Sequence, residues 1–317
     1  MRERIQRMRH HESPYTGPAT FFKATHRPDA DRGEAHIGLL GLPYDEGAGF
    51  RSGARFGPAA LRQASSRYAL GSEGFYDPDG ATMRMVGARL LDVGDVDPLR
   101  NETERTFERI TATARRLRTV ARLPVFVGGD HSISYPVLRA YDDVPELHVV
   151  QLDAHLGYSD ARNGGRVSNA STFRRAVEAV PGLQRITTIG VRSPFVGREA
   201  VDAARARGHG VVSARAFRDD AEAVLAGLPE RAAVYLTVDV DVLDPSLVPG
   251  TGDPEPDGLT YAEVRRVVDA VVGRNRLVGM DLVELAPDLD PSGRSALVAA
   301  RLLLDAFALW WDPARMV

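Results

Sequence analysis

The sequence of 317 residues contains no cysteine, a single lysine and no long hydrophobic run. Without cysteine the chain has no disulfide, thiolate nucleophile, iron–sulfur cluster or thiolate metal site, so any metal must be bound by histidine and carboxylate side chains. No segment approaches the roughly 18 consecutive apolar residues that a membrane span requires, and no apolar stretch follows the basic first residues as in a secretory signal. We therefore expect a cytoplasmic protein that does not associate with membranes.

Charge and composition narrow the class of protein further. The formal net charge is -3, from 40 basic and 43 acidic residues. These charges are scattered and form no basic patch that would attract a polyanion, so we expect no nucleic-acid partner. Hydrophobic residues make up 44% of the chain and charged residues 26%, which is typical of a folded globular protein. The length suits one large α/β domain.

The N-terminal segment differs in character from the rest of the chain. Residues 1–34 are polar, rich in arginine and interrupted by Pro14, Pro18 and Pro28. This composition predicts an irregular arm that lies over the body of the protein or reaches a neighbouring subunit. Residues 35–317 contain no linker and no internal repeat, so we expect them to form a single domain.

Short apolar runs alternate with helical stretches in the expected domain. Runs of this kind are typical of buried parallel strands. They lie at 37–42, 90–93, 125–127, 149–152, 186–191, 210–212, 234–238 and 277–283. Residues 101–104 and 260–263 both fit the capping box that begins a helix. The alternation predicts an α/β protein, a three-layer α/β/α sandwich with a mainly parallel central sheet.

Polar residues follow four of the predicted strands, at the sheet edge where ligands collect in α/β proteins. His131 follows one strand, and each of the pairs Asp153 with His155 and Asp239 with Asp241 follows another. Residues two apart in an extended segment point to the same face. Three nearby carboxylates repel one another unless a cation lies between them, and imidazole with carboxylate suits manganese, zinc or nickel. Each residue alone is commonly structural, but their joint occurrence predicts a metal site.

Together these motifs resemble the signatures of the ureohydrolases, the arginase and agmatinase superfamily. The matching segments are GGDHS at 128–132, QLDAH at 151–155, VDVDVLDP at 238–245, PGTG at 249–252 and GMDLVE at 279–284. The likeness runs from residue 41 to the C-terminal helix and is closer to agmatinases than to arginases. It implies an arginase-like fold, a homotrimer or homohexamer, and two manganese ions bridged by a hydroxide that hydrolyses a small guanidino compound to an amine and urea.

The resemblance also assigns individual roles. One ion would bind to His131, Asp153 and Asp239, and the other to Asp153, His155, Asp239 and Asp241. Coordination lowers the pKa of water from about 15.7 toward 7, which supplies a nucleophile strong enough to attack a guanidinium carbon. Glu284 would pair with the guanidinium and hold its carbon over the hydroxide. The implied catalytic residues are Asp153, Glu284 and Asn169, and Glu284 and Asn169 would also bind the substrate.

Two positions depart from the family pattern. Gly157 stands where the family carries a further aspartate ligand, so we expect the ion beside His131 to bind more weakly. Asp160 is a conceivable replacement, but it has the wrong parity for an extended segment. Asn169 stands where many members carry a histidine that is proposed to shuttle a proton to the leaving amine. An amide can hydrogen-bond a substrate but cannot transfer protons near pH 7, and such transfer is typically worth about 10²–10⁴ in rate.

Two functions therefore stay open. The first is an agmatinase-like amidinohydrolase of altered specificity that binds one or two manganese ions, or nickel or another divalent metal. The second is a catalytically silent ureohydrolase-like protein with a binding or regulatory role. The retained ligands favour the first, because buried carboxylates without a metal destabilise a fold. Arg162 and Arg166 could bind a carboxylate-ended substrate, although solvated surface arginines are the commoner case.

Overall fold

The computed structural model describes residues 13–162 and 164–312, and its centre is a nine-stranded sheet. In chain order the strands of this sheet are β1 (Thr25–His26), β2 (Ala35–Leu42), β5 (Leu90–Asp95), β6 (Ala121–Gly128), β7 (Leu147–Leu152), β8 (Leu183–Val191), β9 (Gly210–Ser213), β10 (Ala233–Asp239) and β11 (Arg276–Val283). Across the sheet their order is β1-β5-β2-β6-β11-β10-β7-β8-β9, and each neighbouring pair is parallel. All eight apolar runs predicted as strands belong to this sheet.

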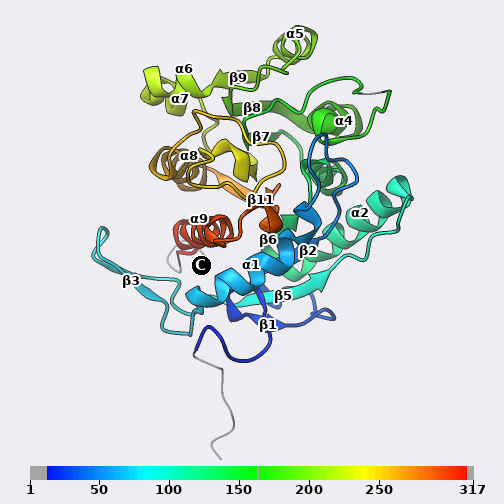
Figure 1. The fold of residues 1–317 in the computed structure, drawn as a ribbon. Helices are drawn as coiled ribbons and strands as arrows, with labels where there is room; N and C mark the ends of the chain where they lie inside the picture. Colours follow the sequence, from blue (N-terminus) through cyan, green and yellow to red (C-terminus); the bar gives the residue numbers. More distant parts are fainter. Residues whose placement is uncertain (1–12, 163, 313–317) are drawn as a thin grey trace, which may run out of the picture.

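Helices connect the strands and cover the sheet on both faces. The α-helices are α1 (Gly57–Ser65), α2 (Thr103–Val120), α3 (Ser134–Leu138), α4 (Thr172–Ala179), α5 (Arg198–Ala206), α6 (Ala214–Asp219), α7 (Ala221–Ala226), α8 (Tyr261–Arg274) and α9 (Arg294–Trp310). The short 3-10 helices are η1 (Phe21–Lys23), η2 (Ala54–Phe56), η3 (Ser66–Tyr68), η4 (His131–Ile133), η5 (Arg139–Tyr141), η6 (Asn169–Ser171), η7 (Val240–Val242) and η8 (Pro287–Leu289). Figure 1 shows α8 and α9 on one side of the sheet and α2 and α4 on the other.

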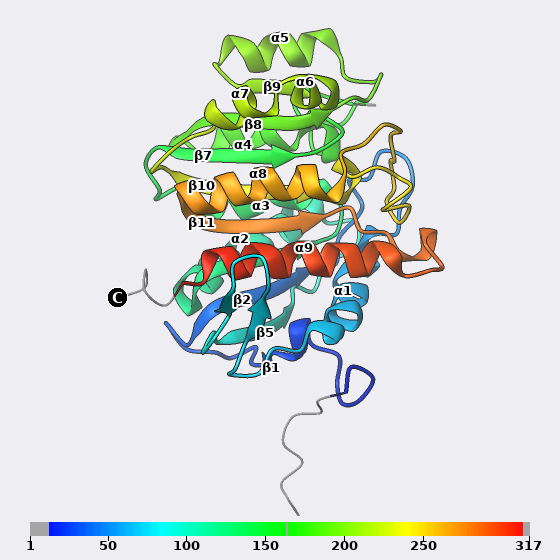
Figure 2. The same cartoon turned by 90° about the vertical axis from the view of Figure 1, so that its left-hand side faces the viewer.

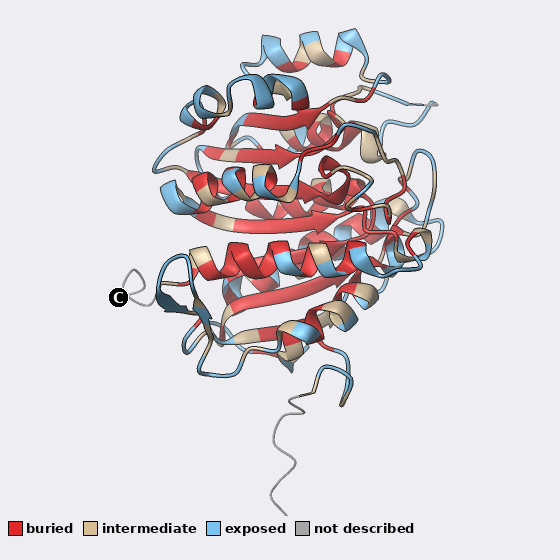
Figure 3. Cartoon of the chain, turned by 60° about the vertical axis from the view of Figure 1, so that its left-hand side comes forward, coloured by how far each residue is buried: buried red, intermediate tan, exposed pale blue. Residues whose placement is uncertain are grey.

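Two hydrophobic cores correspond to the two faces of the sheet. One contains Leu61 of α1, Phe217 of α6 and Leu303 of α9, and the other contains Phe107 of α2 and Phe173 of α4. The strands between them are buried along most of their length, while the outer sides of the helices are exposed (Figure 3). Strands covered on both faces need continuous apolar runs, which is why these runs were visible in the sequence. The predicted α/β/α sandwich is therefore confirmed.

The two predicted capping boxes have different outcomes. The side chain of Thr260 accepts a hydrogen bond from the backbone N–H of Glu263, and the Glu263 side chain accepts one from the N–H of Thr260, which begins α8 as expected. The prediction at 101–104 is wrong. Helix α2 begins at Thr103 without a side-chain cap, because Asn101 has a φ of 58° and turns the chain before the helix.

The described part of the predicted arm packs against the body of the protein. Phe21 and Phe22 are buried, and the ring of Phe22 meets that of Phe307 edge-on at a centroid distance of 5.4 Å. Strand β1 adds to the edge of the sheet beside β5. Residues 1–12 lie outside the described residues, so a boundary near residue 34 stays a prediction.

Elsewhere a small antiparallel hairpin pairs β3 (Phe75–Asp77) with β4 (Thr82–Arg84). Within residues 13–162 and 164–312, no helix combines the length and the hydropathy of a membrane-crossing segment.

Figure 2 shows the arrows of β7 and β11 pointing in the same direction, so that their carboxyl ends and the loops that follow share one edge of the sheet.

Candidate metal centre

The candidate ligands converge because four strands that are distant in sequence are consecutive in the sheet, in the order β6-β11-β10-β7. His131 follows β6, Asp153 follows β7, Asp239 ends β10, and Glu284 follows β11. Parallel strands place their carboxyl ends at one edge, so these side chains open on a common rim. The sequence prediction depended on this convergence, and the structure supplies it.

The first group of candidate ligands consists of His131, Asp153 and Asp239, which are all buried. His131 Nδ1 lies 2.9 Å from Asp153 Oδ2 and 3.0 Å from Asp239 Oδ2. The ligand atoms of the group lie within 4.8 Å of one another. A divalent cation that replaced the imidazole proton would contact all three side chains.

The second group consists of Asp153, His155 and Asp241 and shares Asp153 with the first. His155 Nδ1 lies 2.8 Å from Asp241 Oδ2 and 3.5 Å from Asp153 Oδ1. The other ring nitrogen, Nε2, is buried without a hydrogen-bond partner among the described residues. Because one carboxylate contributes an oxygen to each group, the arrangement suits a pair of ions better than two unrelated sites.

Backbone amides orient the three carboxylates. Asp153 Oδ1 accepts a hydrogen bond from the N–H of His155 at 2.6 Å, and Asp239 Oδ1 accepts one from the N–H of Asp241 at 2.9 Å. Asp241 Oδ1 accepts from the N–H of Ala154, also at 2.9 Å. In Asp239 and Asp241 the second oxygen is the one directed at a histidine, so the backbone fixes the ligand geometry before any ion binds.

The pKa values of the candidate ligands show how their buried charges are balanced. Burial disfavours the charged form of His155, but the carboxylates of Asp241 and Asp153 outweigh it and raise its pKa to about 12. The pKa of His131 is likewise raised well above its usual value, against burial, by Asp153 and Asp239. Burial and the two neighbouring carboxylates raise the pKa of Asp239. Protons therefore neutralise buried charges here, as cations would, and the donor set fits divalent metal.

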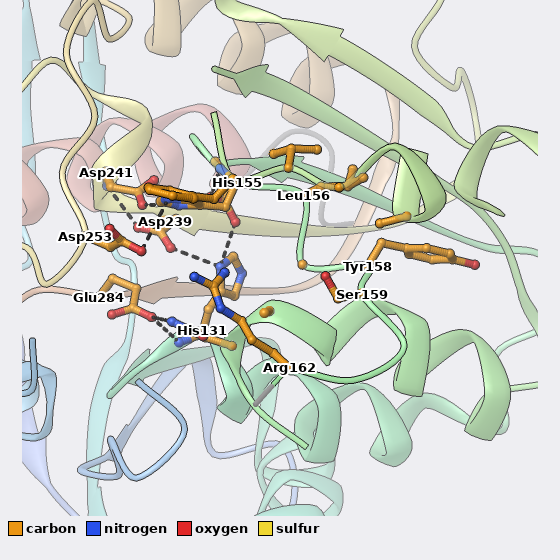
Figure 4. Close-up of a pocket in the computed structure, with 18 residues that line it drawn as sticks. His131, His155, Leu156, Tyr158, Ser159, Arg162, Asp239, Asp241, Asp253 and Glu284 are labelled. Carbon is orange, nitrogen blue, oxygen red and sulfur yellow. Dashed lines mark hydrogen bonds and ion pairs between the residues drawn. The ribbon is translucent and has the colours of Figure 1, made fainter. Parts of the chain in front are cut away.

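Glu284 faces the ligand groups from the end of β11 (Figure 4). Its φ of 63° lies in the left-handed region, which is unusual for a glutamate and typical of functional sites. Its Oε1 accepts hydrogen bonds from the N–H of His131 at 2.8 Å and from Asn169 Nδ2 at 3.4 Å. Burial and the charge of Asp130 raise the pKa of Glu284 to about 8. The structure thus brings Glu284 and Asn169 together beside the ligand groups.

The ring of Phe173 lies next to Gly157 and leaves no space for a side chain there. The φ of Gly157 is 60°, and a Cβ atom added there would lie 2.8 Å from Cδ2 of Phe173. The ring of Phe173 stands edge-on to the imidazole of His131 at a centroid distance of 5.1 Å. An apolar ring therefore packs against both Gly157 and His131, in the space into which a side chain at 157 would extend.

Asp160 does not replace the missing ligand. Its side chain is 49% exposed and accepts hydrogen bonds from the guanidinium groups of Arg166 at 3.3 Å and Arg175 at 2.8 Å. The parity argument from the sequence is consistent with this placement, because Asp160 belongs to a surface network of arginines and acids.

A pocket opens from the ligand groups toward solvent. Its lining combines the candidate ligands, Asn169, Glu284 and the buried Tyr158 with the more exposed Ser159, Arg162, Phe195 and Val196. Figure 4 shows the Arg162 side chain extending toward the polar cluster from the side opposite to Asp253. The site therefore has an acidic floor and a partly apolar mouth.

Several supporting residues were not identified from the sequence. Thr237 Oγ1 lies 2.9 Å from His131 Nε2 and fixes the outer edge of the imidazole. Asp281 is buried, and its Oδ2 accepts hydrogen bonds from Ser134 and Tyr235. Both residues lie inside apolar runs, where a buried polar residue is the available signal. Asp253 Oδ2 lies 3.5 Å from His155 Nε2, in the loop 248–258, whose glycines and prolines are typical of a functional loop.

Comparisons with known proteins agree with this geometry. The model of the arginase family matches residues 35–308. The chain belongs to the arginase family. It is 36% identical over 282 residues to an agmatinase of Pyrococcus horikoshii, covering 87% of this chain and 92% of the relative. It is 32% identical over 280 residues to the human mitochondrial guanidino acid hydrolase, covering 84% of this chain and 76% of the relative.

A solved structure shares the fold of this arginase-family chain. Proclavaminate amidino hydrolase from Streptomyces clavuligerus superposes with a TM-score of 0.80 at 29% sequence identity, covering 94% of this chain and 100% of that one. The predicted ureohydrolase resemblance and arginase-like fold are confirmed. The chain is accordingly a hydrolase of the family that acts on guanidino C–N bonds.

Proposed function

We propose that this arginase-family hydrolase uses divalent metal, with manganese as the expected ion, to hydrolyse a guanidino compound to an amine and urea. The observation that carries the proposal is the pair of ligand groups that share Asp153, with the Glu284 carboxylate beside them. One or two ions fit this donor set, and nickel or another first-row divalent metal is the alternative. The metal ligands would be His131, Asp153, His155, Asp239 and Asp241.

The side chains around the ligand groups support this chemistry. Bound metal would supply a nucleophile by lowering the pKa of water toward neutrality. Glu284 would bind the substrate guanidinium through charge-assisted hydrogen bonds. The raised pKa of Glu284 reflects burial and the neighbouring Asp130 carboxylate, which outweigh the charge of His131, and a guanidinium beside Glu284 would restore the ionised form.

Asn169 would position the substrate. Its amide lies 3.4 Å from Glu284 Oε1, so one substrate group can contact both side chains. An amide does not exchange protons near pH 7, so the leaving amine would take its proton from solvent or from the attacking water. We therefore expect turnover to be slower than in an enzyme with a histidine at this position.

The identity of the substrate, the assembly and the compartment are separate proposals. Agmatine is the default substrate by family resemblance, and the relatives named as agmatinase and as guanidino acid hydrolase differ in the charge at the far end of the substrate. A homotrimer or homohexamer is the assembly that the family resemblance implies, and the cytoplasm is the expected location.

Urea release tests the function. The purified chain would be loaded with manganese or nickel, its bound metal counted, and urea measured with agmatine, 4-guanidinobutyrate and arginine. We expect metal-dependent urea release from at least one compound. Glu284→Gln should lower kcat/KM about a hundredfold, because it leaves a buried guanidinium without its counter-charge. Glu199→Gln, at a side chain that is 70% exposed, is the matched control.

The alternative of a catalytically silent protein makes the opposite prediction. A chain that binds no divalent ion after loading and releases no urea from any of these compounds would support a binding or regulatory role. The cluster of buried carboxylates weighs against this alternative, because buried charges cost stability unless protons or a cation neutralise them.

A further inference from the structure

The loop and helix that border the pocket carry four arginines, and three of them are paired with acids. Arg166 and Arg175 contact Asp160, and Arg174 contacts Glu199 at 2.8 Å. These pairs form a partly exposed network outside the pocket, in which each guanidinium already has a carboxylate partner.

Arg162 differs from these three arginines. Its side chain forms no hydrogen bond or ion pair with the described residues, although it lines the pocket. Its backbone is held by two hydrogen bonds with Gly165, each 2.9 Å long, from N–H to carbonyl in both directions. The backbone pairing with Gly165 anchors the exposed Arg162, whose guanidinium has no partner among the described residues, and Figure 4 shows it pointing toward the polar cluster.

The charge distribution along the pocket is polarised. Arg162 is the one arginine, and no lysine is present, among the described side chains that line it, whereas the candidate metal ligands are largely carboxylates. Asp253 does not neutralise it, because that carboxylate lies 3.5 Å from His155 Nε2 and no ion pair joins it to Arg162. The lining also includes Phe195 and Val196, whose apolar side chains suit an aliphatic chain.

We propose that Arg162 binds the carboxylate at the far end of an ω-guanidino acid, so that the substrate is a guanidino acid and not an aminoalkyl guanidine. This inference rests on the proposed function, because it assumes that the guanidinium end lies at Glu284. The planar guanidinium of arginine is suited to bidentate binding of a carboxylate. A terminal ammonium group would instead meet an unpaired positive charge.

The test compares two substrates of similar length that differ in terminal charge, 4-guanidinobutyrate and agmatine, in the manganese-loaded protein. We expect the wild type to have the higher kcat/KM for 4-guanidinobutyrate. In Arg162→Gln the ratio of the two kcat/KM values should fall about tenfold or more, mainly through the KM for the acid, because a charged hydrogen bond is lost. Arg162→Lys should recover part of the loss.

Arg166→Gln is the matched control, because this arginine is 61% exposed and already paired with Asp160. It should leave the substrate ratio unchanged. A wild type that prefers agmatine, or a ratio that Arg162→Gln does not change, would overturn the assignment of Arg162.

A binding measurement separates this inference from the proposed function. If no guanidino compound releases urea, the proposed function fails. Calorimetric titration of 4-guanidinobutyrate into manganese-loaded wild type and Arg162→Gln then decides the role of Arg162. Binding that weakens about tenfold in the variant supports the carboxylate site, and equal or absent binding in both proteins rejects it.

Discussion

The two ligand groups differ in their surroundings. The side chain of His131 is 3% exposed and packs against the ring of Phe173, whereas the side chain of His155 is 22% exposed, and its Nε2 has no hydrogen-bond partner among the described residues but lies 3.5 Å from Asp253 Oδ2. The ring of Phe173 blocks further ligands from reaching an ion beside His131. An ion beside His155 could take additional ligands from water or from Asp253. We therefore expect two unequal metal positions, with the weaker ion beside His131.

The largest expected effect removes both positions at once. Asp239→Ala deletes a ligand of the His131 group. It also removes the carboxylate that accepts a hydrogen bond from the N–H of Asp241 and so disturbs the second group. We therefore expect no measurable manganese uptake in metal analysis after dialysis. The matched control is Asp160→Ala, which removes an acid of the exposed arginine network and should leave the metal content unchanged. Normal metal content in Asp239→Ala would contradict the assignment of the ligands.

The next effect concerns pH. In the metal-free protein the raised pKa values of His131 and His155, the latter about 12, keep both imidazoles protonated at pH 7. A metal must displace these protons, so binding releases them and strengthens as the pH rises. We expect the association constant to rise about tenfold per pH unit for each proton released, from pH 6 to 8.

Calorimetry in buffers of different ionisation enthalpy counts the released protons. The wild type should release at least one proton per ion, and His155→Gln should release at least one fewer in total. A wild type whose metal affinity is independent of pH would show that the imidazoles are not ligands.

The smallest effect tests why the His131 group is the weaker one. Gly157→Asp alone should lower the Tm without tightening the ion, because the new Cβ meets Phe173 at 2.8 Å and the backbone has a φ of 60°. In a Phe173→Leu background, which makes room, the same change should tighten binding about tenfold relative to Phe173→Leu alone. Manganese titration measures both, and no gain in the double variant would mean that position 157 does not face this ion.

Much of the site could be predicted because its information is local in sequence. A buried strand followed at once by DAH or DVD places its candidate ligands at the carboxyl edge of the sheet, which the sequence could predict. The expected alternation of an extended chain does not hold at DVD, because Asp241 lies in η7 and joins a different ligand group from Asp239. The strands themselves were identified from apolar runs, whereas β1 and the β3–β4 hairpin were missed because they are short and largely exposed. The failed capping box at 101–104 shows that a local motif is overridden when the chain turns through a left-handed residue.

The sequence by itself determined the candidate ligand set and the fold class, because strand periodicity and residue type are properties of neighbouring residues. Only the tertiary structure decided which arginine is free, since Arg162 and Arg166 lie four residues apart and differ only in which acids fold against them. The packing of Phe173 against Gly157 and the contact of Thr237 with His131 likewise join segments that are distant in the chain. Contacts of this kind depend on how the strands are ordered in the sheet, which no local pattern specifies.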